Sequence, residues 1–169
     1  MVSLIEQQSV QAKVNECLAK VLVRFGVDIP KPIIRYNLRG AVAGRAYYYQ
    51  HLIDLNAVLL KENGQKFIDR TVVHEVAHLI AYKLYGSNIR PHGREWANLM
   101  VMLGAQPNRC HSYDVTNARI GKTYSYSCGC RKHALTGIRH KRSREGSRYT
   151  CTKCRKVLVW DQGSPSVAT

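Results

Sequence analysis

The sequence predicts an α+β protein in which a helix-rich domain with a small sheet precedes a cysteine-bearing β module. Apolar residues recur every three or four positions in three segments, which is typical of helices with one buried face. Shorter runs with strand character lie between the first two of these segments, and two close cysteine pairs follow the last. We therefore expect a domain over residues 1–118, a module over 119–160 and a flexible polar tail over 161–169.

The expected elements begin and end where apolar periodicity meets glycine or proline. A glycine follows each of the three expected helices, which cover residues 3–25, 65–85 and 93–103. The connector Ile29–Pro32 precedes three expected strands, at residues 33–36, 41–47 and 52–55. A short helix starting at Asn56 should end before Asn63-Gly64. In the cysteine module the expected strands are residues 124–127 and 149–150.

The charge of the chain is strongly positive and unevenly distributed. Lys and Arg total 26 against 11 acidic residues, which gives a formal charge of +15 and a pI near 9.8. Residues 119–156 hold twelve of the basic residues and a single acid, Glu145. A field of this sign favours a polyanionic partner, nucleic acid before membrane, although a merely solvated basic surface has the same composition.

Cellular location bears on the role of the six cysteines. Residues Met1–Glu6 lack the basic and apolar regions of a signal peptide, and no stretch approaches the roughly 18 apolar residues of a membrane span. We expect a cytoplasmic protein with no membrane partner, near the nucleoid if it is bacterial. In a reducing compartment, cysteines serve as metal ligands or free thiols rather than disulfides.

The strongest chemical signal is the pentapeptide His74-Glu75-Val76-Ala77-His78. His74 and His78 are four residues apart, so they share one face of the predicted helix and can reach a single Zn²⁺. Glu75 then lies beside the metal, where it can deprotonate a bound water. The rest of this helix is apolar, and charged groups are rarely buried without a partner. The pattern therefore predicts a catalytic zinc with Glu75 as the general base.

A catalytic zinc needs a third protein ligand and one open position. His92 is the favoured candidate, because the loop before the next helix can return it to the first two histidines. Glu95, in that next helix, is the alternative. The position six residues after His78 is Leu84, so a third histidine at that spacing is excluded.

The cysteine pairs predict a second, structural zinc. Cys128-Gly129-Cys130 and Cys151-Thr152-Lys153-Cys154 have the layout of a zinc ribbon, in which short hairpins supply four ligands. The first pair is closer together than usual, so His133 could replace one of its cysteines, with His140 as a weaker candidate.

A basic segment lies between the two cysteine pairs, where a ribbon would display it as a hairpin loop. Its candidate nucleic-acid contacts are Arg139, Lys141, Arg142 and Arg144. The aromatic residues nearby are Tyr124, Tyr126, Tyr149 and Trp160. Basic side chains on phosphates and aromatic rings on bases suit single-stranded or distorted DNA, bound without sequence preference. A solvated charge run is the alternative.

These motifs resemble the SprT family, which includes bacterial SprT and the protease domain of eukaryotic Spartan. The resemblance covers about residues 10–160 and is nearest to the bacterial form. It is carried by the pentapeptide and by Pro91-His92-Gly93-x-x-Trp96, Ile53-Asp54-Leu55-Asn56, Tyr126-x-Cys128-x-Cys130-x-x-His133-x-Leu135, Arg139-His140 and Tyr149-x-Cys151-x-x-Cys154. It implies a minimal zincin-like metalloprotease core followed by a zinc-ribbon-like module, with His74, His78 and His92 on zinc. In the Spartan branch, the substrates are proteins crosslinked to DNA.

Three functions are compatible with these patterns. The leading one is a zinc endopeptidase that acts on DNA-associated or DNA-crosslinked proteins. A non-enzymatic nucleic-acid-binding zinc protein with a vestigial site is the second, and a hydrolase of a small amide is the third. An intact Glu75 favours an enzyme, because a purely structural site does not need that carboxylate. Tyr82 and Tyr113 are candidates for a second donor to the carbonyl oxygen of the substrate.

Overall fold

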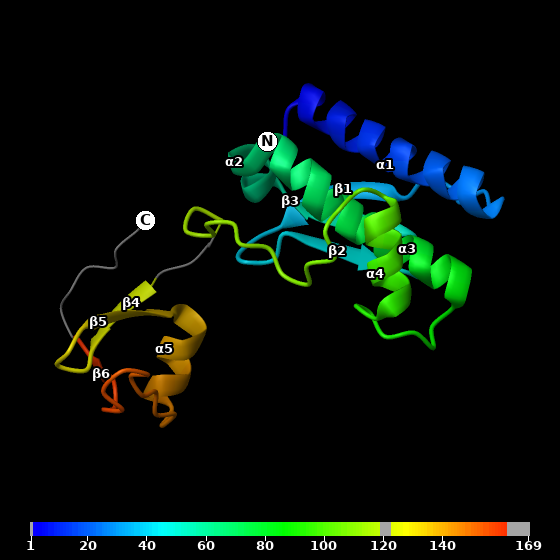
Figure 1. The fold of residues 1–169 in the computed structure, drawn as a ribbon. Coiled ribbons are helices and arrows are strands. Elements are labelled where there is room, and N and C mark those ends of the chain that lie inside the picture. Colours follow the sequence, from blue (N-terminus) through cyan, green and yellow to red (C-terminus); the bar gives the residue numbers. More distant parts are fainter. Residues whose placement is uncertain (1, 119–122, 162–169) are drawn as a thin grey trace. The chain divides into compact units, whose positions relative to one another are not determined.

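The computed structural model describes residues 2–118 and 123–161, and it divides the chain into two compact units. Unit 1 is Met1–Arg119 and unit 2 is Ile120–Thr169 (Figure 1). Both contain helices and a small sheet, so the α+β prediction is confirmed. In the described part of the chain, no helix is long and apolar enough to cross a membrane.

Unit 1 begins with the long helix α1, Leu4–Phe25. Ser3 caps it: its hydroxyl accepts from the backbone N–H of Glu6, whose carboxylate accepts in return from Ser3. Gly26 ends it in the left-handed conformation, at φ 66°. The buried face of α1 carries Val10, Val14, Cys17 and Val21, and it packs against α3 and the turn before α3.

The sheet of unit 1 has the strand order β1-β3-β2, with β1 at Ile33–Leu38, β2 at Gly44–Tyr47 and β3 at Leu52–Asn56. β1 pairs with β3 in parallel and β2 pairs with β3 antiparallel. β3 is therefore central and buried along its length. β2 lies at an edge of the described sheet, and it contacts α3.

Three helical segments follow the sheet without a loop between them: α2 (Ala57–Phe67), the π-helical turn η1 (Ile68–Val72) and α3 (Val73–Tyr85). Asn56 caps α2 through its side-chain oxygen. The expected break at Gly64 is a kink inside α2, at φ 48° and ψ −125°. The predicted helix 65–85 is thus divided by η1, and π-helical turns are frequent near functional sites. Helix α4, Arg94–Met102, then packs against α3.

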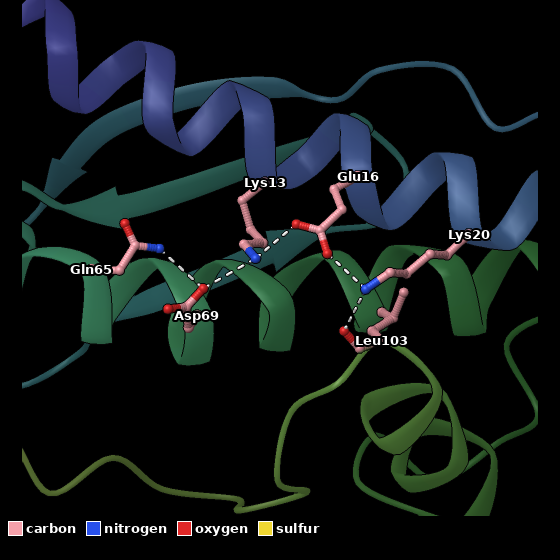
Figure 2. A network of polar contacts seen from close by, with 6 residues as sticks. All are labelled: Lys13, Glu16, Lys20, Gln65, Asp69 and Leu103. Atoms are coloured by element: carbon pink, nitrogen blue, oxygen red, sulfur yellow. Dashed lines mark hydrogen bonds and ion pairs between the residues drawn. The ribbon is translucent and has the colours of Figure 1, made fainter.

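A polar network ties α1 to the segments on either side of α3 (Figure 2). The Lys13 ammonium lies 2.8 Å from the Glu16 carboxylate and 3.1 Å from that of Asp69 in η1. Lys20 contacts Glu16 at 2.6 Å and the carbonyl oxygen of Leu103, after α4, at 3.3 Å. The network fixes the position of η1 relative to α1, and η1 leads directly into α3.

Unit 2 has a sheet of strand order β5-β4-β6, with β4 at Thr123–Ser127, β5 at Lys132–Thr136 and β6 at Val159–Trp160. The prediction of a strand at 149–150 is wrong, because the structure has only an isolated bridge there, Thr150 to Val157. The hairpin loop expected for the basic segment is also wrong. That segment is helix α5, Gly137–Arg144, since Arg and Lys are good helix formers and no glycine or proline interrupts residues 138–144.

Candidate active site and cysteine cluster

Three histidines of unit 1 converge on one point. His74 and His78 come from successive turns of α3, and His92 comes from the loop before α4. Their Nε2 atoms lie 3.1 Å from one another in each of the three pairs. Glu95 is not part of this group, and one of its carboxylate oxygens lies near Gly93 instead.

The chemistry of this donor set fits a metal ion. A separation of 3.1 Å is compatible with three imidazoles bound to one ion at about 2.0–2.1 Å. Burial lowers the pKa of His74 to about 4 and that of His78 to about 3, and it also lowers the pKa of His92. The rings are therefore neutral at pH 7, and the neutral form is the one that binds a metal.

Two neighbours orient the histidines. The His74 ring donates a hydrogen bond to the backbone carbonyl of Asn108, which leaves the lone pair of Nε2 free to point at the centre. The indole of Trp96 lies against all three rings, with centroid distances of 4.8 Å to His74, 5.5 Å to His78 and 4.8 Å to His92. Trp96 is 1% exposed and is therefore a rigid floor for the centre.

Glu75 lies next to the centre and is almost fully buried. Its carboxylate accepts a hydrogen bond from the backbone N–H of Ala46 in β2. Burial is the main cause that raises its pKa, to about 8, while the Ala46 bond and the charge of Arg45 oppose the rise. Gly44 makes room for it, because a Cβ at that position would lie 2.6 Å from Glu75 Cγ. A buried carboxyl group held beside three imidazoles is suited to taking a proton from a metal-bound water.

A cleft of about 590 Å³ opens over this centre. Its walls come from β2 and the residues before it, from α3, and from the loop after α4. His111 joins two of these walls: its Nε2 donates to the carbonyl oxygen of Ala41, and its Nδ1 accepts from the backbone N–H of Tyr113. Tyr113 does not line the cleft, and its hydroxyl bonds to Thr71 at 3.1 Å.

Unit 2 contains a second cluster, made of Cys128, Cys130, Cys151 and Cys154, whose sulfur atoms all lie within 4.8 Å of one another. A backbone hydrogen bond from Cys154 is the main cause that lowers the pKa of the Cys151 thiol, which favours the thiolate form that metals bind. His133 is outside the group of four, but its Nε2 lies 3.3 Å from Cys128 Sγ. Four thiols at this separation fit a closed metal site.

The basic helix α5 packs over an aromatic cluster through His140. The His140 ring stacks on Tyr124 at 3.6 Å, and its Nδ1 lies 3.1 Å from the Tyr126 hydroxyl. His140 is therefore part of the core of unit 2 and does not belong to the cysteine cluster. Tyr126 is only 2% exposed, so the expectation that it stacks on bases is wrong.

The four predicted nucleic-acid contacts of α5 are exposed, and two of them lie over aromatic rings. The guanidinium of Arg139 lies 5.9 Å from the centroid of Tyr149, and that of Arg144 lies 6.0 Å from the centroid of Trp160. Lys141 lies 3.8 Å from Glu145, which partly neutralises it. Among the described elements of unit 2, α5 is thus the most basic, and aromatic rings lie under two of its arginines.

Several residues of the site carried no recognisable sequence signal. The contribution of Asn108 comes from its backbone, and any residue type can make the same bond. Gly44 and Ala46 are small residues in a strand, a pattern with no particular chemical meaning in isolation. His111 could have been flagged as a histidine near a cysteine, but its role in joining the cleft walls depends on the fold.

The fold and the site together define a class: an α+β protein with a candidate three-histidine metal centre beside a buried glutamate, followed by a four-cysteine cluster. The SprT-like family matches residues 14–117, and the chain belongs to this family. Protein SprT of Pseudomonas putida (strain W619) is 40% identical over 153 residues, which are 88% of this chain and 92% of that protein. Protein SprT of Vibrio parahaemolyticus is 40% identical over 145 residues, 85% and 87% of the two chains. No solved structure matches the chain significantly.

Proposed function

We propose that this protein is a zinc-dependent endopeptidase in which Glu75 is the general base. The proposal rests on one observation: His74 and His78 of α3 and His92 of the following loop meet beside the buried carboxyl group of Glu75, also of α3, in an open cleft. A zinc ion held by His74, His78 and His92 would lower the pKa of a bound water and polarise a substrate carbonyl. A structural metal site has no use for a buried carboxylate, whose desolvation is unfavourable.

Glu75 performs the proton transfers. In the metal-free chain, burial raises the pKa of Glu75 to about 8, so the neutral form predominates at pH 7. The charge of a bound zinc would lower this pKa and favour the carboxylate, and the hydrogen bond from Ala46 fixes its direction. It takes a proton from the attacking water and then delivers that proton to the leaving amine. Atoms balance in this sequence, because the water supplies both the hydroxyl group of the new acid and the proton of the new amine.

The edge strand β2 supports an extended peptide as the substrate. It lines the cleft and has a second strand, β3, on one side only in the described sheet. Backbone groups on a free strand edge can pair with an extended chain, which is a common mode of peptide recognition. A peptide bound along β2 would pass Glu75 at Ala46, so that a bond within the chain, rather than at its end, meets the reacting groups.

The proposal extends to nucleic acid and to unit 2. The cysteine cluster would hold a second, structural zinc, and α5 would bind DNA through Arg139, Lys141, Arg142 and Arg144 without reading its sequence. Supporting this are the exposure of these four side chains and the concentration of positive charge in residues 119–156. The natural substrates would then be proteins bound or crosslinked to DNA.

The test combines metal analysis with cleavage. The purified chain should contain two zinc ions and should cleave a basic DNA-binding protein faster when single-stranded DNA is present. The Glu75→Gln variant should keep both ions and lose about 10²–10⁴-fold in kcat, the usual contribution of a general base. Equal cleavage by this variant would refute the role of Glu75. DNA binding without cleavage by either form would instead identify a non-enzymatic nucleic-acid-binding protein.

DNA binding by α5 can be tested separately from cleavage. Binding to phosphates displaces counterions, so the affinity should depend strongly on salt concentration. Replacing the four basic residues of α5 by Gln should reduce both the affinity for single-stranded DNA and the slope of log affinity against log salt. Binding that does not change with salt would refute this part of the proposal and leave the peptidase assignment intact.

A further inference from the structure

The residues that line the cleft differ in chemistry. Arg70 of η1 lines it, as do Arg109 and His111 of the loop after α4. Tyr48, in the turn after β2, also lines it, and its ring stacks on that of Tyr82, with centroids 5.0 Å apart and planes 12° apart. Tyr49 adds an edge contact to Tyr82 at 5.9 Å and 70°. We call Tyr48, Tyr49 and Tyr82 the aromatic wall.

The aromatic wall adjoins the histidine centre. Tyr82 lies four residues after His78 on α3, so both side chains are on one face of that helix. Tyr48 lines the cleft, and its ring meets that of His78 in an edge contact at 6.5 Å and 62°. Burial raises the pKa of the Tyr48 phenol, and the charge of Glu75 raises it further. Tyr48 is therefore partly withdrawn from water and lies within the electric field of Glu75.

On the β2 side, Glu75 itself fills the space beside Gly44. Gly44 is in contact distance of the glutamate, and Ala46 donates its backbone N–H to it. Gly44 and Ala46 are alternate residues of β2 and lie on one side of that strand. Tyr48 begins the turn after β2 and lines the same cleft as both of them. Tyr48 is the first large side chain in this series, and a peptide running along β2 would meet it next to the reacting bond.

We propose that the aromatic wall is a specificity subsite that binds an aromatic or large aliphatic side chain of the substrate residue adjoining the scissile bond. This inference rests on the proposed peptidase function. Tyr48 presents its ring to the cleft and is held there by its stack on Tyr82, so it provides an apolar surface of defined geometry, which aromatic and large aliphatic groups cover well. The wall touches a ligand of the metal centre, so a nucleobase stacked there would block the approach of a peptide carbonyl. This position favours a peptide side chain over nucleic acid as the occupant.

The experiment measures kcat/KM for a peptide series with Phe, Leu, Gly or Asp at each position flanking the cleaved bond. With the wild-type chain, we expect Phe and Leu to exceed Gly and Asp by about 10–200-fold at one of the two positions, the discrimination typical of an apolar pocket. Tyr48→Ala should reduce this ratio about tenfold, mainly by slowing the Phe and Leu peptides. Tyr48→Phe should preserve it, because the ring and not the hydroxyl forms the surface.

Tyr85→Ala is the matched control. Tyr85 ends the same helix as Tyr82 but is 45% exposed, and among the described residues no ring contact joins it to Tyr48, Tyr82 or the histidines. Its replacement should leave the ratio unchanged. Zinc content and thermal unfolding of each variant show whether the fold and the centre are intact, and Tyr82→Ala provides a second test of the wall if Tyr48→Ala does not fold.

A binding measurement separates failure of the subsite from failure of the proposed function. In the Glu75→Gln background, fluorescence anisotropy should show tighter binding of the Phe peptide than of the Asp peptide, and Tyr48→Ala should remove the difference. If the wild-type chain cleaves no peptide, the proposed function is refuted. The difference in binding between the Phe and Asp peptides still tests the subsite in that case. A preference that persists in the variants with the wall removed would overturn the inference. So would a loss of oligonucleotide affinity in Tyr48→Ala with no change in peptide preference.

Discussion

The two candidate metal centres of this protein differ in their ligands and in what surrounds them. The histidine group of unit 1 has three donors, an open cleft and a buried carboxylate beside it. The cluster of unit 2 has four cysteines within 4.8 Å, and the described group includes no acidic side chain. Three donors leave a position for water or substrate, whereas four thiolates complete the coordination of zinc. The number of protein ligands therefore distinguishes the two candidate centres: three would leave a position where a reaction can occur, and four would leave only a structural role.

The units also differ in how much core supports each centre. Unit 1 has an extensive apolar core that includes side chains of α1, α3 and the sheet. In unit 2, the buried side chains of the described residues are few, and two of them are cysteines of the cluster: Tyr126, Cys128, Leu135, His140 and Cys151. A domain this small buries too little apolar surface to fold firmly without a cross-link or a metal. Metal should therefore be needed for folding in unit 2 and for chemistry in unit 1.

The largest expected effect is the loss of the fold of unit 2 when its cluster is broken. Structural zinc in small modules contributes roughly 10–16 kcal/mol, so Cys151→Ser should unfold unit 2 and reduce the zinc content from two ions to one. NMR spectra of the full chain would show dispersed signals from unit 1 only. Cys110→Ser, at an exposed cysteine of unit 1, is the control and should keep both ions. If unit 2 stays folded after Cys151→Ser, its fold does not depend on the metal, and the proposed difference between the two units is refuted.

A smaller effect, on kcat and not on folding, is expected when Gly44 is replaced. The added Cβ of Gly44→Ala would meet Glu75 Cγ at 2.6 Å, so the carboxylate must move away from its place beside Ala46. We expect kcat to fall about 10²-fold or more, because a displaced base loses most of its contribution. Zinc content and stability should change little. Loss of zinc from this variant would mean that Gly44 supports the ligands rather than the base.

The metal-free form of unit 1 should have a maximum of stability near pH 6.5. His74 and His78 have folded-state pKa values depressed from 6.5, to about 4 and 3, so their contribution is present above pH 6.5 and is lost as the pH falls. Glu75 has a pKa raised from 4.5 to about 8, so its contribution is lost as the pH rises between these values. Denaturant unfolding of the zinc-depleted chain should show losses of about 1 kcal/mol within 1.5 pH units on either side. Glu75→Gln should abolish the loss on the alkaline side and steepen the acidic side, because the contribution of Glu75 no longer offsets that of the histidines there.

The smallest effect concerns the surface network that ties α1 to η1. Hydrogen bonds from Lys13, and then from Lys20, lower the pKa of Glu16 from 4.5 to about 2. The carboxylate is 44% exposed, so screening by water limits Glu16→Gln to about 0.2–1 kcal/mol. The contribution should be complete above pH 4.5 and disappear as the pH falls towards 2. Asp28→Asn is the control, since Asp28 forms no ion pair within the described residues. A loss of several kcal/mol would mean that ion pairs, and not apolar packing, hold unit 1 together.

The sequence predicted much of the fold because its signals are local. Apolar spacing and terminal glycines placed both ends of α1 and α4 within one residue and the end of α3 at Tyr85, and the α+β class and the family are confirmed. The errors fell where the outcome depended on distant contacts. Helix α5 was expected as a hairpin loop, because it lies between the two cysteine pairs of a predicted ribbon. Its one buried member, His140, is held by Tyr124 and Tyr126 from β4. The π-helical turn η1 likewise has no pattern of its own in the sequence.

The sequence by itself determined which side chains can act at the candidate site, and that His74 and His78 share one face of a helix. Those properties depend only on residue type and on the period of an α-helix. Only the tertiary structure decided that His92 joins them at 3.1 Å, and that Asn108 and Trp96 orient the rings. The tertiary structure also decided the environment of Glu75. The space beside this residue depends on Gly44, which lies in an edge strand thirty-one positions earlier in the chain. A pKa depends on the charges, dipoles and water around a group, and in a folded chain most of these come from residues far away in sequence.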